Sequence, residues 1–298
     1  MDLNVRIVVL GAGGMLGHKM FQTLRQRFAN TLGTIRGTTG DQAHCRIGLF
    51  QKGNLIEKVD VMNQAALAAC LRSHRPEFVV NCIGIIKQRP DAHSHLASIA
   101  INALLPHQLA ELCREWGGRL VHFSTDCVFS GKRGNYAEDD PSDAEDLYGK
   151  TKLLGEVDAP SALTLRTSII GRELSEFRSL LEWFLGQKDG TVRGFTRALY
   201  SGVTTNFLAR LVADIIADHP SLNGLYQVTS PTISKYDLLC LLRQAYGLST
   251  QIVADDTFFC DRSMRGDKLR AAIGYKCPSW PDLCAELADD PTPYERSR

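Results

Sequence analysis

The sequence has little of what marks several large classes of protein. Positive and negative charges nearly cancel, with a formal net charge of +1, so composition gives no support for a nucleic-acid partner. No uninterrupted apolar run approaches the roughly 18 residues that a membrane-spanning helix needs. The start, MDLNVRIVVLG, lacks the cationic segment and long apolar core of a secretory signal. We therefore expect a soluble, cytoplasmic protein with no nucleic-acid or membrane partner.

The cysteines do not form a recognisable framework either. There are nine of them, an odd number, and they are scattered without a C-x-x-C pair. A disulfide-stapled fold and a structural zinc site are both disfavoured by this spacing. We expect reduced thiols and no metal.

Short β-branched runs alternate with helical segments through most of the chain. The expected strands lie at 5–10, 31–37, 77–84, 119–125 and 163–170. The expected helices lie at 18–27, 64–74, 97–118 and around Tyr148, and Pro106 should bend or interrupt the third unless it begins a new turn. This alternation predicts an α/β, Rossmann-type, doubly wound parallel sheet.

The second half of the sequence is less regular. We expect a dinucleotide-binding Rossmann domain at 1–170, to which residues 201–230 return as a helix and a further strand. Residues 171–200 and 231–298 then form a smaller α+β substrate-binding cap. The last ten residues, DDPTPYERSR, are expected to be a loose tail.

Four glycines separate the first strand from the first helix. Gly11, Gly13, Gly14 and Gly17 stand where a dinucleotide pyrophosphate sits on a helix N-terminus. Glycines there permit a tight turn and let backbone N–H groups approach the phosphates. The alternative is a plain tight turn.

Arg36 bears on the choice of dinucleotide. An acidic residue after the second strand would hold the ribose of NAD, whereas an arginine accommodates the 2′-phosphate of NADP. Arg36 occupies this region, and no Asp or Glu occurs from Gly33 to Gly40. We expect NADP(H) to be preferred over NAD(H), unless Arg36 is only a solvated loop residue. Asp60 and the stretch Asn81–Gly84 follow other strands and could meet the cofactor or be turn signals.

Tyr148 and Lys152 lie four residues apart, on one face of a helix. By itself this pair is compatible with an ordinary surface. Together with Ser124 and Thr125 at the end of a strand, however, it resembles the short-chain dehydrogenase/reductase superfamily. The spacing of Gly11, Gly14 and Gly17, the segment STDCVFSG and the segment YGKTKLLGE are most similar to the extended, nucleotide-sugar branch, specifically the dTDP-4-dehydrorhamnose reductase family.

The resemblance implies roles for individual residues. Tyr148 donates a proton to the substrate carbonyl; a free phenol, with a pKa of about 10, is poorly suited to reversible proton transfer. Lys152, helped by the charge of the oxidised nicotinamide, stabilises the phenolate and bonds the nicotinamide ribose. Thr125 bonds the carbonyl oxygen. Asn102 helps to hold a water and the lysine in line, or is merely a polar residue that distorts its helix.

The implied binding residues form two sets. The cofactor set is Gly11, Gly14, Met15, Leu16, Gly17, Arg36, Asp60, Val61, Asn81, Cys82, Gly84, Ser124, Tyr148, Lys152 and Thr167. The substrate set is Asp126, Cys127, Val128, Ile169, Thr204 and Arg262. Arg262 lies in a cationic stretch that suits a nucleotide diphosphate or a solvated face equally well.

The residue type at position 127 differs between reaction classes among the families that this chain resembles. Related dehydratases have a glutamate at this position, so dehydration is disfavoured. An epimerising reductase, GDP-fucose synthase, has a cysteine here with a histidine after the fifth strand, but RTSIIGRELSEF contains no histidine. The rhamnose family itself has tyrosine in place of Cys127 and tryptophan in place of Ile169, which leaves the sugar open.

The expected activity is NADPH-dependent reduction of a nucleotide-linked 4-keto-6-deoxy sugar. Two alternatives remain. One is an epimerase-reductase of a nucleotide sugar. The other is a non-catalytic NADP-binding regulatory subunit, because the β subunit of methionine adenosyltransferase resembles the same family. A homodimer is compatible with the sequence, which does not determine the oligomeric state.

Overall fold

A seven-stranded sheet forms the centre of the computed structural model, which describes residues 4–40, 48–51, 53–87 and 93–294. Its strand order is β11-β6-β5-β4-β1-β2-β3, and every neighbouring pair is parallel. The strands are β1 (Ile7–Leu10), β2 (Thr31–Thr34), β3 (Leu55–Ile56), β4 (Phe78–Asn81), β5 (Arg119–Thr125), β6 (Ala162–Thr167) and β11 (Gly224–Gln227). The predicted Rossmann-type parallel sheet is confirmed.

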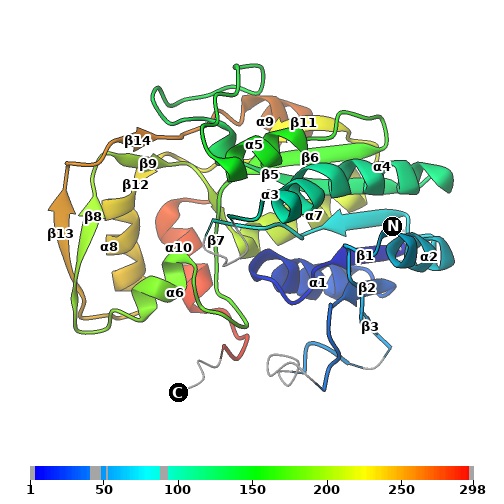
Figure 1. Cartoon of the computed structure of the whole chain (residues 1–298). Coiled ribbons are helices and arrows are strands. Elements are labelled where there is room, and N and C mark those ends of the chain that lie inside the picture. Colours follow the sequence, from blue (N-terminus) through cyan, green and yellow to red (C-terminus); the bar gives the residue numbers. More distant parts are fainter. Residues whose placement is uncertain (1–3, 41–47, 52, 88–92, 295–298) are drawn as a thin grey trace.

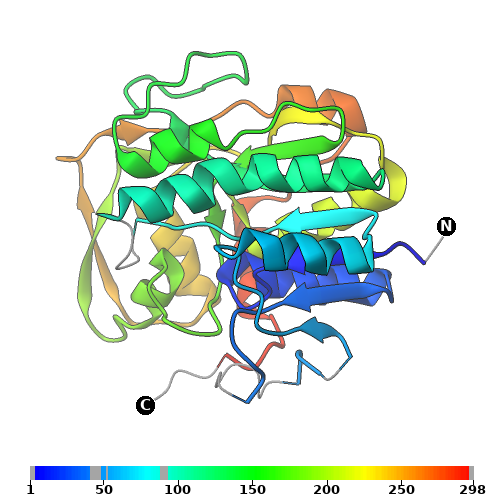
Figure 2. The ribbon, with the colours of Figure 1, turned by 45° about the vertical axis from the view of Figure 1, so that its right-hand side comes forward.

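Helices cover both faces of this sheet. Within β1, Ile7 and Val9 pack into one hydrophobic cluster, while Val8 and Leu10 pack into another. The first cluster includes residues of α1 (Met15–Arg27) and α7 (Thr205–Asp218), and the second includes residues of α2 (Gln64–His74) and α4 (Leu105–Glu115). Figure 2 shows α2 and α4 crossing in front of the sheet. A strand buried on both faces reads as a continuous apolar run, as IVVL does.

The helix after β4 is not regular. It consists of α3 (His95–Ser98), a π-helical segment η3 (Ile99–Leu104) and then α4, with Pro106 in the first turn of α4. The helix runs from η3 into α4 without a break, so the proline removes one N–H donor from a continuous helix, and the irregular π turn lies where that bond is missing. The widened π turn therefore lies directly before the proline, and it contains Asn102.

The stretch His95–Glu115 is also the one helical segment of the described residues that could cross a membrane by length and composition. Within its most apolar window, 44% is buried inside the protein. Leu105, Leu109 and Cys113 pack into the cluster that covers the sheet. Core helices of soluble proteins meet the same test, so the segment is weak evidence for a membrane span.

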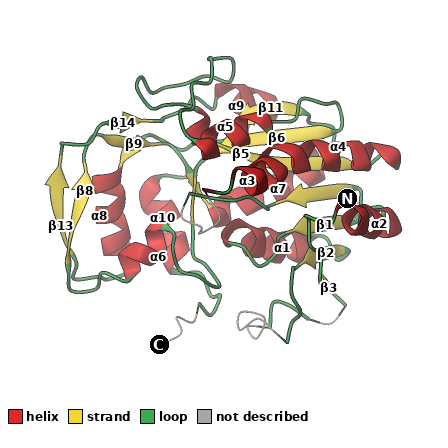
Figure 3. Ribbon diagram, viewed as in Figure 1, coloured by secondary structure: helices red, strands yellow, loops and turns green. Residues whose placement is uncertain are grey.

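Smaller elements lie beyond the carboxyl ends of the central strands (Figures 1 and 3). Three small sheets pair β7 (Ile169–Ile170) with β10 (Val203–Thr204), β8 (Thr191–Phe195) with β13 (Gln251–Asp255), and β9 (Ala198–Tyr200) with β12 (Ile233–Ser234) and β14 (Cys260–Asp261). The remaining helices are α5 (Leu147–Leu154), α6 (Leu180–Leu185), α8 (Lys235–Ala245), α9 (Asp267–Ile273) and α10 (Trp280–Ala288), and η4 (Asp126–Val128) is a 3-10 turn. The division into a cofactor domain and a cap stays a prediction.

The prediction of a loose C-terminal tail is wrong for the residues that the structure describes. Thr292 is 8% exposed, and the side chain of Asp290 is 1% exposed in an ion pair with Lys19. Tyr294 bonds His18. The sequence DDPTPY looks polar and breaker-rich, but its polar groups have buried partners on α1. Residues 295–298 lie outside the described part.

Candidate active site

The carboxyl ends of the central strands bring the predicted site residues to one edge. Gly11 follows β1, whose last residue Leu10 pairs with Asn81 at the end of β4. Thr125 ends β5 and pairs with Thr167 at the end of β6. Ligands of open parallel sheets bind outside this edge.

The glycine turn is built for a close approach of backbone to a ligand. Gly11 has a φ of +77°, which favours glycine. A Cβ atom on Gly17 would lie 2.0 Å from the carbonyl oxygen of Gly11, so no side chain fits there. A Cβ atom on Gly14, the N-cap of α1, would lie 3.4 Å from the same oxygen. The turn therefore suits a pyrophosphate, with Met15 as the first residue of the helix.

Two predicted cofactor residues lie at the surface beside this turn. Arg36 follows β2 and is exposed, as a residue that meets a 2′-phosphate must be. Asp60 is exposed as well, and its carboxylate accepts a hydrogen bond from the backbone N–H of Met62 at 3.0 Å. Val61 is half-buried against the cluster under α2.

Asn81 supports the site from beneath. It is 1% exposed, and its side chain contacts the N–H of Ile83 at 3.1 Å and the ring Nδ1 of His122 at 3.2 Å. His122 lies in turn 3.3 Å from Nζ of Lys152. The amide of Asn81 thus orders the turn that contains Cys82 and Gly84, and its side chain is not free to bind a cofactor. The sequence did not single out His122, although a histidine inside an apolar strand was a usable signal.

Lys152 is buried, with 5% of its surface exposed. Its ammonium group donates to the carbonyl oxygen of Phe123 at 2.5 Å. Burial lowers the pKa of Lys152 to about 8, and the charge of Glu156 opposes that shift. The lysine is therefore held firmly against β5 and titrates just above neutral pH.

Tyr148 lies near Thr125 and Cys127. Burial raises the pKa of Tyr148 well above its usual range, the nearby Cys127 thiol raises it further, and hydrogen bonding with Thr125 lowers it. The α5 helix that carries Tyr148 starts at Leu147 because Asp146 caps it, accepting from the N–H of Gly149 at 2.8 Å. Tyr148 thus keeps its proton at neutral pH in the protein alone.

Asn102 bonds the backbone of Ile85 and the side chain of Thr151. Its side-chain oxygen accepts from the N–H of Ile85, and its side-chain nitrogen donates to the carbonyl oxygen of Ile85, both at 2.9 Å. The nitrogen also lies 3.3 Å from the hydroxyl of Thr151 on α5. These contacts position α5 against the loop after β4. The expected water between Asn102 and Lys152 stays a prediction.

Cys127 and Arg262, separated by more than a hundred residues, meet at the site. A guanidinium nitrogen of Arg262 lies 3.6 Å from Sγ of Cys127, and Nε donates to the carbonyl oxygen of Phe129 at 2.9 Å. Burial raises the pKa of the Cys127 thiol to about 12, and the neighbouring Asp126 raises it as well. Cys127 is therefore a thiol rather than a thiolate. The other arginines and the lysine of that cationic stretch bond to Asp267 or to backbone on the surface.

Two residues of the predicted substrate set have fully buried side chains. The side chains of Val128 and Thr204 are 0% exposed: Val128 packs with Phe129 and Met264, and Thr204 caps α7 by accepting from the N–H of Phe207. Neither side chain is exposed to the site, so a substrate contact at these positions would come from the backbone, and their place in the substrate set stays a prediction. A sequence motif locates a backbone position but does not say which way its side chain points.

Three residues of the predicted cofactor set use their side chains for contacts within the protein. The hydroxyl of Ser124 donates to Glu156 at 2.6 Å, and that of Thr167 donates to the carbonyl oxygen of Val228 at 2.9 Å. Leu16 belongs to the hydrophobic core. These side chains hold the fold around the site, so any cofactor contact must come from their backbones. Ile169 in β7 remains half-buried.

Lys235 is a functional candidate that the sequence did not reveal. Its Nζ lies 3.7 Å from the centre of the Tyr200 ring. Burial lowers the pKa of Lys235 to about 8, while the charges of Asp126 and Cys127 oppose the shift. In the sequence, Lys235 is only the first residue of an amphipathic helix, so no local signal marks it. The structure adds this cation to the substrate side of the site.

The fold and this edge define the class: a Rossmann-type protein with the Thr–Tyr–Lys arrangement of the extended short-chain dehydrogenases/reductases. Residues 5–256 match the family described as RmlD substrate binding domain. The chain belongs to this family.

Relatives that are similar over most of their length include both an enzyme of sugar-nucleotide metabolism and a subunit of another enzyme. The probable dTDP-4,6-dihydroxy-2-methyloxan-3-one 4-ketoreductase of Streptomyces antibioticus is 30% identical, over 78% of this chain and 75% of that protein. The methionine adenosyltransferase 2 subunit beta of Danio rerio is 26% identical, over 82% of this chain and 74% of that protein. Among solved structures, the dTDP-4-dehydrorhamnose reductase of Bacillus anthracis in complex with NADP has a TM-score of 0.78 at 19% identity, covering 95% of this chain and 97% of that chain.

Proposed function

We propose that this protein reduces a nucleotide-linked 4-keto-6-deoxy sugar with NADPH. The observation that carries the proposal is the hydrogen bonding of Tyr148 with Thr125 at the carboxyl edge of the sheet, with Lys152 four residues along the same helix and bonded to the backbone of β5. The Streptomyces relative, named as a 4-ketoreductase of a dTDP-sugar, supports the same reaction class.

The protein's own groups provide the proton. When bound, NADPH supplies the hydride. The ketone oxygen, hydrogen-bonded by Thr125, takes its proton from the Tyr148 hydroxyl. A phenol is protonated at neutral pH, and the raised pKa of Tyr148 keeps it so in the protein, so the proton is present before reaction, as the reductive direction requires. The phenolate that remains is stabilised by Thr125 and by the positive charge of Lys152.

The cofactor site fits a dinucleotide on structural grounds. At Gly11 and Gly17 a side chain would collide with Ile83 and with the Gly11 carbonyl, so the turn can be this tight only with glycine. The N-terminus of α1 that follows it offers backbone N–H groups to an anion. Arg36 is exposed after β2 and would pair with the 2′-phosphate, which makes NADP(H) our proposed preference over NAD(H).

We also propose that reduction proceeds without epimerisation. Epimerising a carbon beside the ketone needs a base to remove a carbon-bound proton, and the raised pKa of Cys127 keeps its thiol protonated at neutral pH, so it is not available as that base. Turnover in deuterated water with unlabelled NADPH should leave C3 and C5 free of deuterium by mass spectrometry and NMR. Enzyme-dependent deuterium there, lost in Cys127→Ser, would make Cys127 catalytic and favour an epimerase-reductase.

A regulatory subunit is the second candidate, because the Danio rerio relative is named as a subunit of methionine adenosyltransferase. NADPH consumption with a panel of nucleotide-linked 4-keto sugars separates the two. Oxidation of NADPH with at least one member supports the reductase. Tight NADPH binding with no turnover across the panel would favour the regulator.

A further inference from the structure

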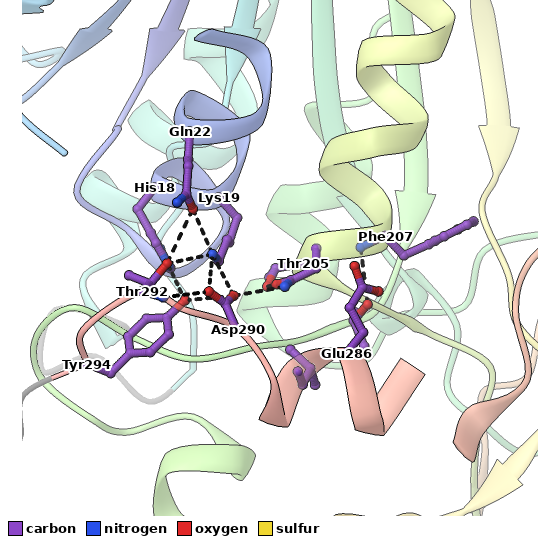
Figure 4. A network of polar contacts seen from close by, with 12 residues as sticks. His18, Lys19, Gln22, Thr205, Phe207, Glu286, Asp290, Thr292 and Tyr294 are labelled. Atoms are coloured by element: carbon purple, nitrogen blue, oxygen red, sulfur yellow. Dashed lines mark hydrogen bonds and ion pairs between the residues drawn. The ribbon is translucent and has the colours of Figure 1, made fainter. Parts of the chain in front are cut away.

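Residues near the end of the chain pack beneath the glycine turn. Asp290, Thr292 and Tyr294, called here the C-terminal clasp, contact the first turn of α1 (Figure 4). More than 270 residues separate the partners in sequence. Nothing in the proposed reaction uses the clasp.

A buried ion pair anchors the clasp. Nζ of Lys19 lies 2.5 Å from one carboxylate oxygen of Asp290, and the two side chains are 6% and 1% exposed. Lys19 also donates to Gln22 and Thr292, at 2.7 and 2.8 Å. Asp290 accepts further hydrogen bonds from Asn206 at 2.8 Å and from the N–H of Thr292 at 3.0 Å. All these partners hold the short segment in one place, which places Tyr294.

Tyr294 reaches the glycine turn through His18. The ring Nδ1 of His18 lies 2.9 Å from the carbonyl oxygen of Gly14, and Nε2 lies 2.9 Å from the hydroxyl of Tyr294. A carbonyl oxygen only accepts, so Nδ1 must carry a hydrogen. Burial lowers the pKa of His18 to about 4, so the ring is neutral, and Nε2 accepts from the tyrosine hydroxyl. The other acceptor near this hydroxyl, Oδ2 of Asp290, is farther away at 3.4 Å.

The tyrosine ring is held from the other side as well. The guanidinium of Arg172 lies 4.5 Å from its centre, and Nε of Arg172 donates to the buried carboxylate of Glu182 at 2.6 Å. The ring therefore has a fixed orientation, with its hydroxyl aimed at His18. The chain of contacts runs from the segment after β7, through Tyr294 and His18, to the backbone of Gly14.

We infer that Tyr294 and His18 are positioning residues for the dinucleotide, because they hold the carbonyl of Gly14 and thereby the orientation of the N–H groups that meet the pyrophosphate. The inference rests on the proposed cofactor site. It assigns a part in cofactor affinity to the end of the chain.

The test is the dissociation constant for NADPH, measured by fluorescence titration without any sugar. Tyr294→Phe keeps the ring between Arg172 and His18 and removes only the hydroxyl. We expect the dissociation constant to rise about threefold to tenfold, as loss of one buried hydrogen bond would produce. In steady-state assays the change should fall on KM for NADPH rather than on kcat.

Tyr275→Phe is the matched control. Its hydroxyl accepts from the backbone N–H of Thr229 at 3.2 Å and has no contact with the clasp, Arg172 or the glycine turn among the described residues. It removes a tyrosine hydroxyl from the same end of the chain, so it should lower the melting temperature similarly without changing NADPH affinity. A Tyr294→Phe protein with a lower melting temperature but an unchanged dissociation constant would overturn the inference and leave the clasp a stabilising contact only.

A double-mutant cycle tests whether Tyr294 acts through His18. His18→Asn keeps a side-chain donor for the Gly14 carbonyl but is too short to reach Tyr294. In that background, Tyr294→Phe should not weaken NADPH binding further. If Tyr294→Phe weakened NADPH binding as much in the His18→Asn protein as in the native protein, Tyr294 would act on the cofactor site without His18. These titrations use no sugar. A protein that binds NADPH but reduces none of the sugars would therefore contradict the proposed function, while the titrations would still test this inference.

Discussion

Tyr148 and Lys152 share a helix face but have different surroundings. Lys152 is enclosed and bonded to the backbone of β5, whereas Tyr148 faces Thr125 and Cys127. The ammonium is thus fixed by the sheet, and the phenol is fixed by its neighbours at the strand end. In the proposed reaction, the sheet would thus hold the lysine charge while the strand end holds the proton donor.

Replacing Tyr148 with phenylalanine tests the proton donor. The variant should keep NADPH affinity, because only the hydroxyl is lost, and kcat should fall about 10²- to 10⁴-fold. Stopped-flow or steady-state oxidation of NADPH measures the rate, and fluorescence titration measures the binding. Tyr226→Phe, on β11, is the control and should retain turnover. Near-native turnover of Tyr148→Phe would rule out the assignment.

The second prediction for a single residue concerns Arg36 and the choice between NADPH and NADH. A charge-assisted pair with the 2′-phosphate should make NADPH bind about tenfold to a hundredfold more tightly than NADH. Arg36→Ala should remove most of that difference, as measured by calorimetric titration of both cofactors. Arg6→Ala is a control. Arg6 lies just before β1, at the amino edge of the sheet, where it pairs with Glu77. Equal affinities in the unmutated protein would leave Arg36 a loop residue.

Among the elements, α5 depends on a close approach to the π turn of η3. A Cβ atom on Gly155, just after α5, would lie 1.9 Å from the carbonyl oxygen of Asn102. The backbones can meet only because residue 155 has no side chain. That contact, together with the bond between Asn102 and Thr151, sets the position of the helix that carries Tyr148 and Lys152. A π-helical turn at a functional site is a recurrent arrangement.

Gly155→Ala is therefore expected to destabilise the fold. The added methyl group must displace backbone, and overpacking of this kind costs about 1–3 kcal/mol. Urea unfolding followed by circular dichroism gives the free energy of unfolding. For comparison, Gly40→Ala adds a Cβ whose nearest atom is 3.8 Å away, and it should change stability by less than about 0.5 kcal/mol. Equal stability of the two variants would contradict the steric argument.

At the scale of the whole molecule, the first helix is tied to the last described residues. Lys19 and His18 on α1 contact Asp290, Thr292 and Tyr294. The sheet alone does not need these contacts, because its two apolar faces are already covered. The clasp makes the stability of the N-terminal half depend on the C-terminal segment.

This link predicts a pH dependence of stability. Burial lowers the pKa of His18 from 6.5 to about 4, so below pH 6.5 the unfolded chain gains a proton that the folded chain does not bind. The free energy of unfolding should therefore fall as the pH drops from 6.5 to about 4, by about 3 kcal/mol in total from this group, and be unaffected above 6.5. Urea unfolding at several pH values measures the slope.

The variant that isolates this group is His18→Asn, which should flatten the slope between pH 6.5 and 4. Replacing the exposed His74 with asparagine should leave the slope as it is. A slope that is the same with and without His18 would show that other groups carry the acid sensitivity.

The sequence by itself determined the parallel sheet, the glycine turn, and the approach of Thr125 to Tyr148. Each rests on local patterns: apolar runs that bury a strand on both faces, glycines where no Cβ fits, and residues that follow strand ends. The carboxyl ends of parallel strands meet at one edge, so residues named from separate motifs came together.

Only the tertiary structure decided the contacts between distant segments. Lys235 and the clasp residue Tyr294 have no local pattern, because their partners lie tens to hundreds of residues away. The cationic stretch around Arg262 did not reveal its contact with Cys127, for the same reason. The outward or inward direction of Val128 was likewise undetermined, since a strand end leaves the next side chain free to turn either way. The polar segment DDPTPY reads as a tail until Lys19 and His18, buried on α1, supply the partners that make its burial favourable.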